Sequence, residues 1–521
     1  MSPIFSYDEL PYSSHPVQLS HPDNLACKAI LHGLQAPPIE SCRVLELGCG
    51  TGANLLSLAQ ILPNATLVGV DYAQRQIDQG KALTDTVGIK NVELIAASLA
   101  DLDGQLGMFD YVICHGVYSW VSADIQRQIL SNVKRHLAPR GVGYVSYNTF
   151  PGWHLRGLIR EVLCYQTKGT GDPNEQVNKA RKYLDFLIQY SPDPEGLYSK
   201  ILQKERDILN RTPDTYLYHE HLEETNEPLY FHEFARRIAE HELQYLCEAS
   251  YHPEEASFSE EVRTHLSQLS RDRTDYEQHI DFLVNGTFRR SLLCHADLPI
   301  SSQPSTLAVK HVRMRSRARP VKPISDINSY DPEEFRGPRG ETVTSSHALI
   351  KAALLCLSEH WPRSLSLEEL HELTKAKLKA KPDPVQQLQD AELLAKAILR
   401  CYRTDLIQFH LHELPEIHQI SERPMAAPLS RWQAIRREPV SNLAHELVDP
   451  SDFDRFVLSL LDGTRDRADI ILAMIEHVQR GDITLQQKGV PVHDPELIAT
   501  VVEHTLSKTF ERFIDMSLLQ G

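Results

Sequence analysis

The sequence has no paired cysteines, no long apolar run and no excess of basic residues, and each absence argues against a class of protein. Its nine cysteines include no CxxC pair, so we expect reduced thiols and no zinc-type metal site. No apolar run approaches the roughly 20 residues that span a bilayer, so we expect no membrane span. Residues 1–16 lack the basic and apolar stretches of a secretory signal, and we expect a cytoplasmic location.

The balance of charge is acidic. Lysine and arginine number 54 and aspartate and glutamate 70, which gives a formal net charge of −16. Such a surface disfavours nonspecific binding to nucleic acid, so we expect no nucleic-acid partner. Hydrophobic residues make up 41 % and charged residues 24 %, which is typical of a globular protein. A chain of 521 residues is too long for one compact domain, so we expect about three or four units.

Between Cys42 and Tyr147 short apolar segments alternate with helical ones. The predicted strands are residues 43–47, 66–70, 92–96, 111–114 and 143–147. The predicted helices between them are residues 54–62, 74–86 and 123–137. This alternation predicts an α/β fold with a parallel sheet that helices cover on both faces. Ligands of such sheets bind at the carboxyl ends of the strands.

The rest of the chain is predicted to be mostly helical. Helix is expected over residues 153–209 and again from residue 214 to about residue 295. A stretch rich in Pro, Ser and Arg, residues 299–338, looks like a linker, and residues 415–429 look like a second one. In the first stretch four arginines recur with period two and would share one face of an extended strand. We expect a solvated face, with docking of an acidic protein or lipid head group as the alternative, for Arg313, Arg315, Arg317 and Arg319.

A glycine-rich loop follows the first predicted strand. Glycines at alternate positions after Glu46 allow a tight turn and let a ligand touch the backbone. Asp71 ends the second predicted strand, where its carboxylate can accept hydrogen bonds from ribose hydroxyls. A dinucleotide prefers GxGxxG spacing and no acid beside its phosphates, whereas this loop reads GxGxG. S-adenosylmethionine has no phosphate and carries an ammonium and a sulfonium, which Glu46 attracts. We therefore expect S-adenosylmethionine, in preference to a dinucleotide or a chance turn.

The predicted cofactor-binding residues lie where the first four strands end. Ser98 and its neighbour follow the third strand, where adenine is expected, although a serine is a weaker partner than the acid commonly found there. His115 follows the fourth strand, beside the reactive methyl group. The predicted set is Glu46, Gly48, Cys49, Gly50, Gly52, Asn54, Asp71, Tyr72, Ser98, Leu99 and His115.

The methyl acceptor is expected beside two aromatic segments, residues 115–120 and 147–154, which follow the fourth and fifth strands. The segment 7–12 is a third candidate, as a lid. Methyl transfer is an in-line displacement that needs a neutral nucleophile held close to the methyl group, with water excluded. A histidine could take a proton from an amine, or a tyrosine could orient it. The predicted catalytic residues are His115, Tyr118, Tyr12, Trp153 and His154; packing of the lid is the alternative role and is favoured for Trp153 and Phe150.

These motifs resemble bacterial class I methyltransferases that carry a methyltransferase regulatory domain. The resemblance rests first on residues 12–52 and 147–154. Residues 218–222, 230–234 and 288–295 look like the regulatory region. Residues 461–466 are similar to the C-terminal winged-helix part of the family's protein-lysine methyltransferases, which methylate outer-membrane proteins in rickettsiae.

The resemblance implies a Rossmann-like class I methyltransferase domain over residues 1–210 and a helical regulatory domain over residues 211–300. Linker strands and a winged-helix-like domain would follow over residues 301–414, and a second winged-helix-like domain over residues 425–521. It also implies a protein substrate that is methylated on lysine amines. Two alternatives stay open: a small-molecule acceptor, and a cofactor-binding regulator with a vestigial acceptor site. The sequence does not determine the oligomeric state or the target.

Three histidines in the regulatory region suggest a metal site at first sight. They stand beside glutamates in a helical, aromatic stretch, where a hydrogen-bonded core is the expected role. We therefore expect no metal at His219, His221 and His232.

Overall fold

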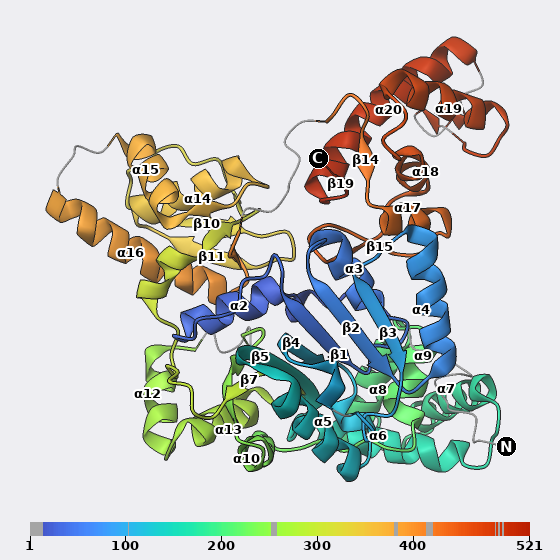
Figure 1. Ribbon diagram of the computed structural model, residues 1–521, viewed down its shortest axis with the longest axis vertical. Coiled ribbons are helices and arrows are strands. Elements are labelled where there is room, and N and C mark those ends of the chain that lie inside the picture. Colours follow the sequence, from blue (N-terminus) through green and yellow to red (C-terminus); the bar gives the residue numbers. More distant parts are fainter. Residues whose placement is uncertain are drawn as a thin grey trace.

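The computed structural model describes residues 14–102, 104–251, 258–379, 384–412, 420–484, 486–487, 490–491 and 494–520. Its centre is a seven-stranded sheet in the order β3-β2-β1-β4-β5-β7-β6 (Figure 1). Strands β1 to β5 are parallel, β7 is antiparallel to β5, and β6 is antiparallel to β7. The predicted α/β fold is therefore confirmed. The strands are β1 (Arg43–Leu47), β2 (Thr66–Asp71), β3 (Val92–Ala96), β4 (Phe109–Cys114), β5 (Leu137–Asn148), β6 (Leu243–Glu248) and β7 (Phe288–His295).

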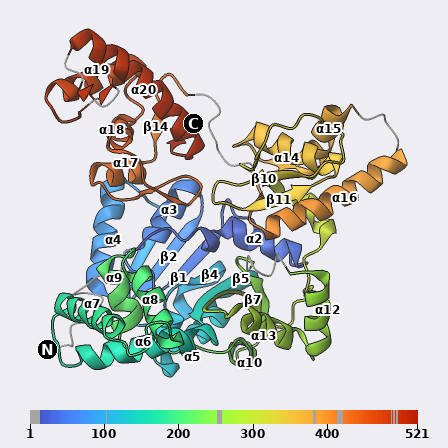
Figure 2. The ribbon, with the colours of Figure 1, turned by 180° about the vertical axis from the view of Figure 1, so that it is seen from behind.

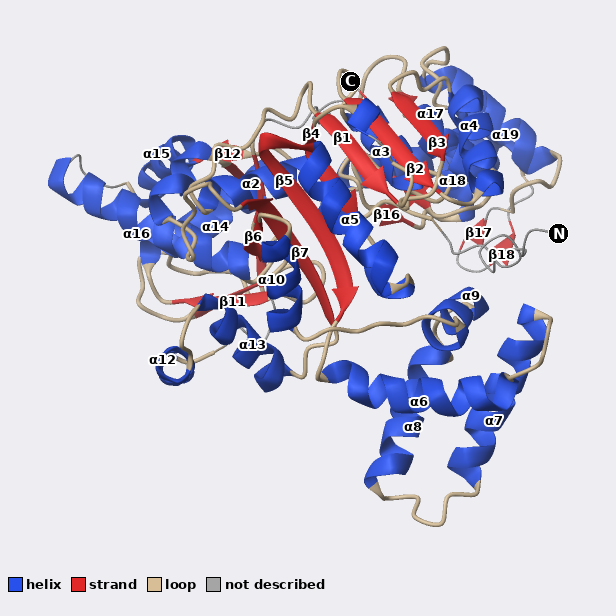
Figure 3. Cartoon of the chain, turned by 60° about the horizontal axis from the view of Figure 1, so that its bottom comes forward, coloured by secondary structure: helices blue, strands red, loops and turns tan. Residues whose placement is uncertain are grey.

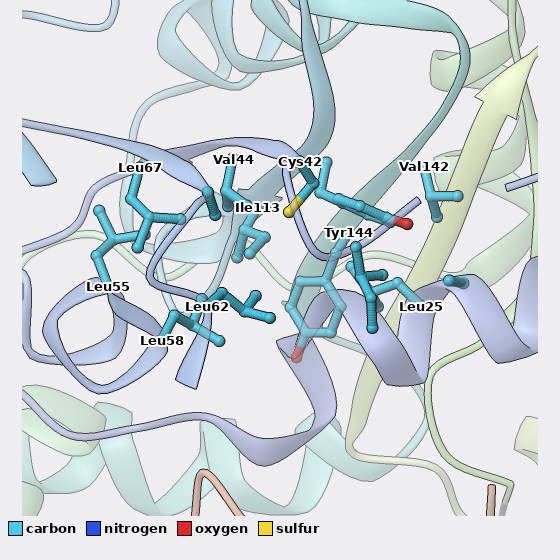
Figure 4. Packing of buried hydrophobic residues seen from close by; sticks show 14 of the residues in the cluster. Leu25, Cys42, Val44, Leu55, Leu58, Leu62, Leu67, Ile113, Val142 and Tyr144 are labelled. Carbon is cyan, nitrogen blue, oxygen red and sulfur yellow. The ribbon is translucent and has the colours of Figure 1, made fainter. Parts of the chain in front are cut away.

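Helices cover both faces of the sheet. Figure 4 shows Leu55 and Leu58 beside Val44 and Leu67, in a core where one helical face packs on the apolar side chains of β1 and β2. On the opposite face a second buried cluster forms around Tyr147 and the helices that cover it. The first face carries α2 (Pro22–Leu31), α3 (Ala53–Ile61) and α4 (Gln74–Val87), and the second carries α5 (Ala123–His136) and α10 (Phe231–Glu240). Short helical turns are η1 (Gln18–Ser20), η2 (Gly104–Leu106) and η3 (Tyr118–Trp120).

The segment predicted to be helical from residue 214 to residue 295 also contains two strands, β6 and β7, which complete the sheet. For β7 the prediction failed because the strand contains Arg289, a charged residue that is buried in the folded protein. Arg289 is 1 % exposed and donates to Asp281, Glu248 and Glu277. Because these carboxylates compensate its charge, Arg289 can be buried in the sheet, although the sequence of this segment looks polar. Helices still dominate the segment, with α12 (Glu260–Leu269) and α13 (Arg273–Val284) beside α10.

A helical bundle follows β5 and projects from the sheet (Figure 3). Its core joins Leu163, Leu184 and Leu202 from three helices. Two of the three histidines named above lie here: His219 bonds Glu223 at 2.7 Å and His221 bonds Glu205 at 2.8 Å. The third, His232, is exposed on α10 and bonds Gln278 at 2.9 Å. The bundle comprises α6 (Gly152–Thr167), α7 (Pro173–Gln189), α8 (Leu197–Leu209), α9 (Asp214–Leu217) and the π-helical turn η4 (Tyr218–Leu222).

The third unit of the chain packs beside α2 (Figure 1). Two small sheets in it have the orders β12-β8-β13 and β11-β10-β9. Its helices are η5 (Thr306–His311), α14 (Ala348–His360), α15 (Leu367–Leu378) and α16 (Pro384–Arg403). Its strands are β8 (Arg313–Arg315), β9 (Arg319–Pro320), β10 (Glu333–Arg336), β11 (Thr342–Ser345), β12 (Leu365–Ser366) and β13 (Gln408–His410).

The linker predicted over residues 299–338 is wrong, because Val309, Met314 and Phe335 are fully buried in the core of this third unit. The solvated arginine face is wrong as well. Arg315 is 2 % exposed, donates to Oε1 of Gln408 at 2.9 Å and lies over the ring of Trp361. The strand ends at Arg315, so the four arginines do not share one extended face.

The fourth unit lies beside α3 and α4, as Figures 1 and 2 both show. The amide of Leu429 donates to Oε1 of Gln60 on α3 at 3.1 Å, so the contact is specific. Helices of this unit are α17 (Pro428–Ile435), α18 (Asp452–Leu460), α19 (Arg467–Gln479) and α20 (Pro495–Asp515). Its strands are β14 (Met425–Ala426), β15 (Val440–Ser441), β16 (Leu447–Val448), β17 (Gln486–Gln487), β18 (Val490–Pro491) and β19 (Leu519–Gln520). No helix in the described part of the chain has the length and apolarity to cross a membrane.

Candidate functional site

The loop between β1 and α3 makes a sharp turn at the carboxyl edge of the sheet. Gly48, Gly50 and Gly52 all have positive φ, at 78°, 56° and 75°, which glycine adopts without strain. The amide of Gly50 donates to Oδ2 of Asp71 at 2.8 Å, and the amide of Ala73 donates to Oδ1 at 2.9 Å. Asp71 therefore ties the loop to the end of β2, at the position where it can also meet a ribose.

Glu46 is a buried acid at the end of β1, with 4 % of its surface exposed. Its Oε1 accepts from Nδ2 of Asn54 at 3.1 Å, and no described residue donates to its Oε2. Burial raises the pKa of Glu46 to about 8; the bond from Asn54 opposes the rise and the charge of Asp71 adds to it. A buried carboxyl oxygen without a partner is costly, so it calls for a donor or a cation. The ammonium of S-adenosylmethionine meets this need, and the residues present fit that cofactor.

The remaining predicted cofactor residues differ in what they can offer. The side chain of Cys49 is buried against Gly69, so only its backbone can face a ligand. The side chain of Leu99 is buried in the core cluster that includes Tyr147. Ser98 is half-buried and its hydroxyl accepts from the amide of Ala100 at 3.2 Å, at the edge where adenine was predicted. Tyr72 is 61 % exposed directly after Asp71.

His115 lies at the tip of β4 and is half-buried. Its Nδ1 is 2.9 Å from the hydroxyl of Tyr144, and its ring meets the ring of Phe288 at 6.3 Å. Burial, with the charges of Arg290 and His15, lowers the pKa of His115 to about 3. The imidazole is therefore neutral at physiological pH and is too weak a base to deprotonate an ammonium, but it can orient a group by hydrogen bonding.

Three partners of His115 were missed by the sequence argument: Tyr144, Phe288 and Arg290. Tyr144 comes from the middle of β5, and the other two come from the unpredicted strand β7. Ser146 and Arg290 are register partners, as are Asn148 and Phe288, so β7 places its side chains on the same face as Tyr144. Only the period-two alternation in residues 288–295 could have indicated this placement, and the buried charge of Arg289 obscures it.

Two predicted catalytic residues are in the core, which contradicts a role as pocket lining. Tyr118 is fully buried on the opposite face of the sheet, between the rings of Tyr147 and Phe234. Trp153 is 1 % exposed and packs edge-to-face on Trp120. Both side chains are buried because an aromatic ring removes a large apolar area from water when it packs in the core. For Trp153 this is the packing role favoured above.

His154 is exposed at the start of α6, stacked on Phe150 with 4.1 Å between ring centroids. Its Nε2 is 3.0 Å from the hydroxyl of Tyr230. It is not among the contacts of His115, so the structure does not bring the two predicted histidines together. Tyr12, with the whole segment 7–12, lies outside the described residues.

The class is defined by four features together: the sheet order, the glycine turn, the buried acid at the end of β1 and the acid at the end of β2. They are those of a class I methyltransferase, which takes S-adenosylmethionine at the carboxyl edge of strands β1 to β4. S-adenosylmethionine supplies an electrophilic methyl group on its sulfonium.

Comparisons with known proteins agree with this class. Residues 44–141 match the family described as "Methyltransferase domain", residues 213–295 match "Predicted methyltransferase regulatory domain", and residues 422–518 match "PKMT, C-terminal winged helix domain". The uncharacterized protein RP789 of Rickettsia prowazekii is 31 % identical over 527 residues, which cover 98 % of this chain and 93 % of that protein.

Solved structures give the same result. The structure of PKMT2 from Rickettsia typhi is similar with a TM-score of 0.85 at 29 % identity, covering 98 % of this chain and 100 % of that one. The same values hold for PKMT2 in complex with AdoHcy, the product that S-adenosylmethionine leaves after methyl transfer. The chain belongs to the bacterial class I S-adenosylmethionine-dependent methyltransferases that carry a methyltransferase regulatory domain, and its cofactor is S-adenosylmethionine.

Proposed function

We propose that this methyltransferase transfers the methyl group of S-adenosylmethionine to lysine side-chain amines of a protein substrate. The observation that carries the proposal is the likeness to PKMT2, which extends over 98 % of the chain and includes the C-terminal unit. A small acceptor needs no such platform beside the catalytic sheet. The resemblance of the sequence to protein-lysine methyltransferases points to the same substrate class.

The chemistry at the tip of β4 suits an amine acceptor. A lysine amine, with a reference pKa of about 10.4, must lose its proton before it can attack the methyl group. The guanidinium of Arg290, 4.8 Å from the ring of Phe288, adds positive charge beside His115 and so favours the neutral amine. The aromatic face of Phe288, which is half-buried, can accommodate the cation that forms after transfer.

We assign the residues of the donor site accordingly. Glu46 would hold the ammonium of S-adenosylmethionine through Oε2, and Asp71 would accept from the ribose hydroxyls. Ser98 would meet the adenine, and Tyr72 would cover the ribose from the solvent side. His115, held by Tyr144, would orient the acceptor amine.

Incubation with radiolabelled S-adenosylmethionine tests the proposal. The full-length protein is mixed with a bacterial lysate or with single metabolites, and a parallel reaction contains excess AdoHcy to show that label depends on the donor site. Label in protein bands that hydrolysis recovers as methyl-lysine supports the proposal. Label only in small molecules would establish the small-molecule alternative. No AdoHcy-sensitive label in any fraction would favour the cofactor-binding regulator.

A further inference from the structure

A turn of the fourth unit inserts a histidine beneath the donor loop. His445 lies between β15 and β16, is fully buried, and has a positive φ of 58°. Its Nε2 is 2.9 Å from Oδ1 of Asn54, and its Nδ1 is 2.9 Å from Oγ of Ser57, both on α3. Residues almost four hundred positions apart in the chain, at separations of 391 and 388, therefore meet next to the cofactor loop.

The direction of each hydrogen bond at Asn54 follows from one backbone group. The amide of Val17 donates to Oδ1 of Asn54 at 2.8 Å, so that atom is the carbonyl oxygen of the side chain. Nδ2 must then donate, and it reaches Oε1 of Glu46 at 3.1 Å and Oγ of Ser20 at 3.2 Å. The ring nitrogen of His445 that faces Oδ1 must carry a hydrogen, because an amide oxygen only accepts.

The tautomer of His445 is then defined. Nε2 donates to Asn54, and in the neutral ring Nδ1 accepts from the hydroxyl of Ser57. Burial holds the pKa of His445 well below its ordinary value, which agrees with a neutral ring. Both nitrogens are satisfied, so the imidazole has one orientation in this position.

The turn itself is built to present this ring. Oδ1 of Asn442 accepts from the amides of Ala444 and Glu446 at 3.0 and 2.8 Å, which closes the turn around His445. The carboxylate of Glu446 accepts from Nε2 of Gln18 at 2.8 Å. The turn and the segment before α2 therefore converge on Asn54 from two sides.

We propose that His445 is a positioning residue of the donor site: it fixes the amide of Asn54, which fixes Oε1 of Glu46 and leaves Oε2 directed at the ammonium of S-adenosylmethionine. The inference rests on the role of Glu46 given under the proposed function. It assigns the C-terminal unit a part in donor binding, independent of which acceptor the enzyme methylates.

Two substitutions of His445 separate the two ring contacts. In His445→Asn the short side chain keeps an acceptor near Ser57 and tolerates the left-handed backbone, but it does not reach Asn54. In His445→Gln the longer amide again presents a nitrogen donor to Asn54. Loss of one hydrogen bond predicts that His445→Asn binds S-adenosylmethionine and AdoHcy about three- to tenfold more weakly, while His445→Gln stays within about twofold of wild type.

Dissociation constants are measured by isothermal titration calorimetry on the full-length protein, with melting temperatures recorded for each variant. Gln60→Ala is the matched control, because it removes the bond from Leu429 that also joins the C-terminal unit to α3, yet leaves Asn54 intact. The proposal predicts unchanged donor affinity for Gln60→Ala. Equal weakening in Gln60→Ala and His445→Asn, or wild-type affinity in His445→Asn, would overturn it.

A measurement on the wild type covers the case in which a variant fails to fold. With ¹⁵N-labelled histidine, the ring resonances of His445 should report a neutral Nε2–H form and should shift when AdoHcy binds. Absence of that response overturns the proposal. Glu46→Gln is titrated in parallel: if its donor affinity equals that of wild type, the assigned role of Glu46 fails, which is distinct from a failure at His445 alone.

Discussion

Glu46 shows how burial and charge are balanced at a single residue of the donor site. Its pKa of about 8 means that in the donor-free protein at neutral pH the carboxyl is mostly protonated. A cationic ligand beside Oε2 favours the ionised form. The raised pKa also makes the free energy of unfolding depend on pH. The stabilising contribution of the protonated Glu46 is fully present below the ordinary pKa of a glutamate and is lost as the pH rises through about 8.

Binding of S-adenosylmethionine is therefore expected to release a proton from Glu46. Calorimetric titration at pH 7 in buffers with different ionisation enthalpies should show release of most of one proton, because the pKa lies near 8. The release should fall toward zero above about pH 9, and donor affinity should rise with pH up to about 8. Glu46→Gln should abolish the release; proton release of the same size in that variant would refute the assignment.

The hydroxyl of Tyr144 holds His115, so its removal should affect catalysis more than donor binding. Tyr144→Phe is expected to lower kcat about tenfold with little change in KM for S-adenosylmethionine. Tyr147→Phe is the matched control: its hydroxyl meets Ser291 at 3.3 Å in the core on the opposite face of the sheet. Equal kcat for Tyr144→Phe and wild type would remove the pair from the mechanism.

At the scale of elements, the donor loop and the loop after β4 are fitted to each other. Gly48 has a φ of +78°, and a Cβ at this position would lie 2.3 Å from Cγ2 of Val117. A contact that short requires the side chain of Val117, or the loop that carries it, to shift. The glycine therefore serves both the backbone turn and the close approach of the loop after β1 to the loop after β4.

Gly48→Ala is expected to lower the melting temperature and weaken donor binding, because left-handed strain adds to the clash with Val117. Gly88→Ala separates the two effects: Gly88 has a similar φ of +73°, and nothing lies within 4 Å of an added Cβ. Its cost should be the backbone strain alone, about 1–2 kcal/mol. Val117→Ala in the Gly48→Ala background should restore part of the donor affinity, and no restoration would argue against the clash.

At the scale of the whole molecule, helix α2 links the catalytic sheet to the third unit. Oδ2 of Asp23 is 2.6 Å from Nδ1 of His410, and Oδ1 accepts from the amide of Leu411 at 2.7 Å. Burial alone would raise the pKa of Asp23, but the hydrogen bond and charge of His410 outweigh it, and the pKa is lowered. We propose the divisions 1–210, 211–300, 301–414 and 425–521 as units of the chain, with β6 and β7 of the second completing the sheet of the first.

Asp23→Ala should loosen the third unit from α2, because it leaves the half-buried imidazole of His410 and the half-buried amide of Leu411 without their partner. The expected cost is about 2–4 kcal/mol, seen as faster hydrogen exchange in β13 and α2. Since the pKa of Asp23 is lowered, its stabilising effect in wild type is present above about pH 4 and is lost as the pH falls below that. Asp78→Ala, at an exposed site on α4, is the control. Unchanged exchange in β13 would show that the bond does not hold the units together.

The sequence by itself was enough to predict the α/β fold, the donor loop and S-adenosylmethionine, because these depend on local rules. Strand and helix periods, glycine turns and an acid at a strand end act within about thirty residues of one another. Tyr118 shows the limit of that reasoning, since its aromatic character suited a pocket and a core equally well. Whether Tyr118 lies in a pocket or in the core depends on the helix that covers it, which here is α10 with Phe234.

Only the tertiary structure decided the rest. The partners of His115 come from β5 and from β7, a strand whose buried Arg289 hides its pattern until the paired carboxylates are seen. The contact of His445 with Asn54 joins two units, and no period or motif connects positions so far apart. Burial and hydrogen bonding between distant segments depend on how the units pack, so residues that hold or orient the reacting groups emerge only when the chain is folded.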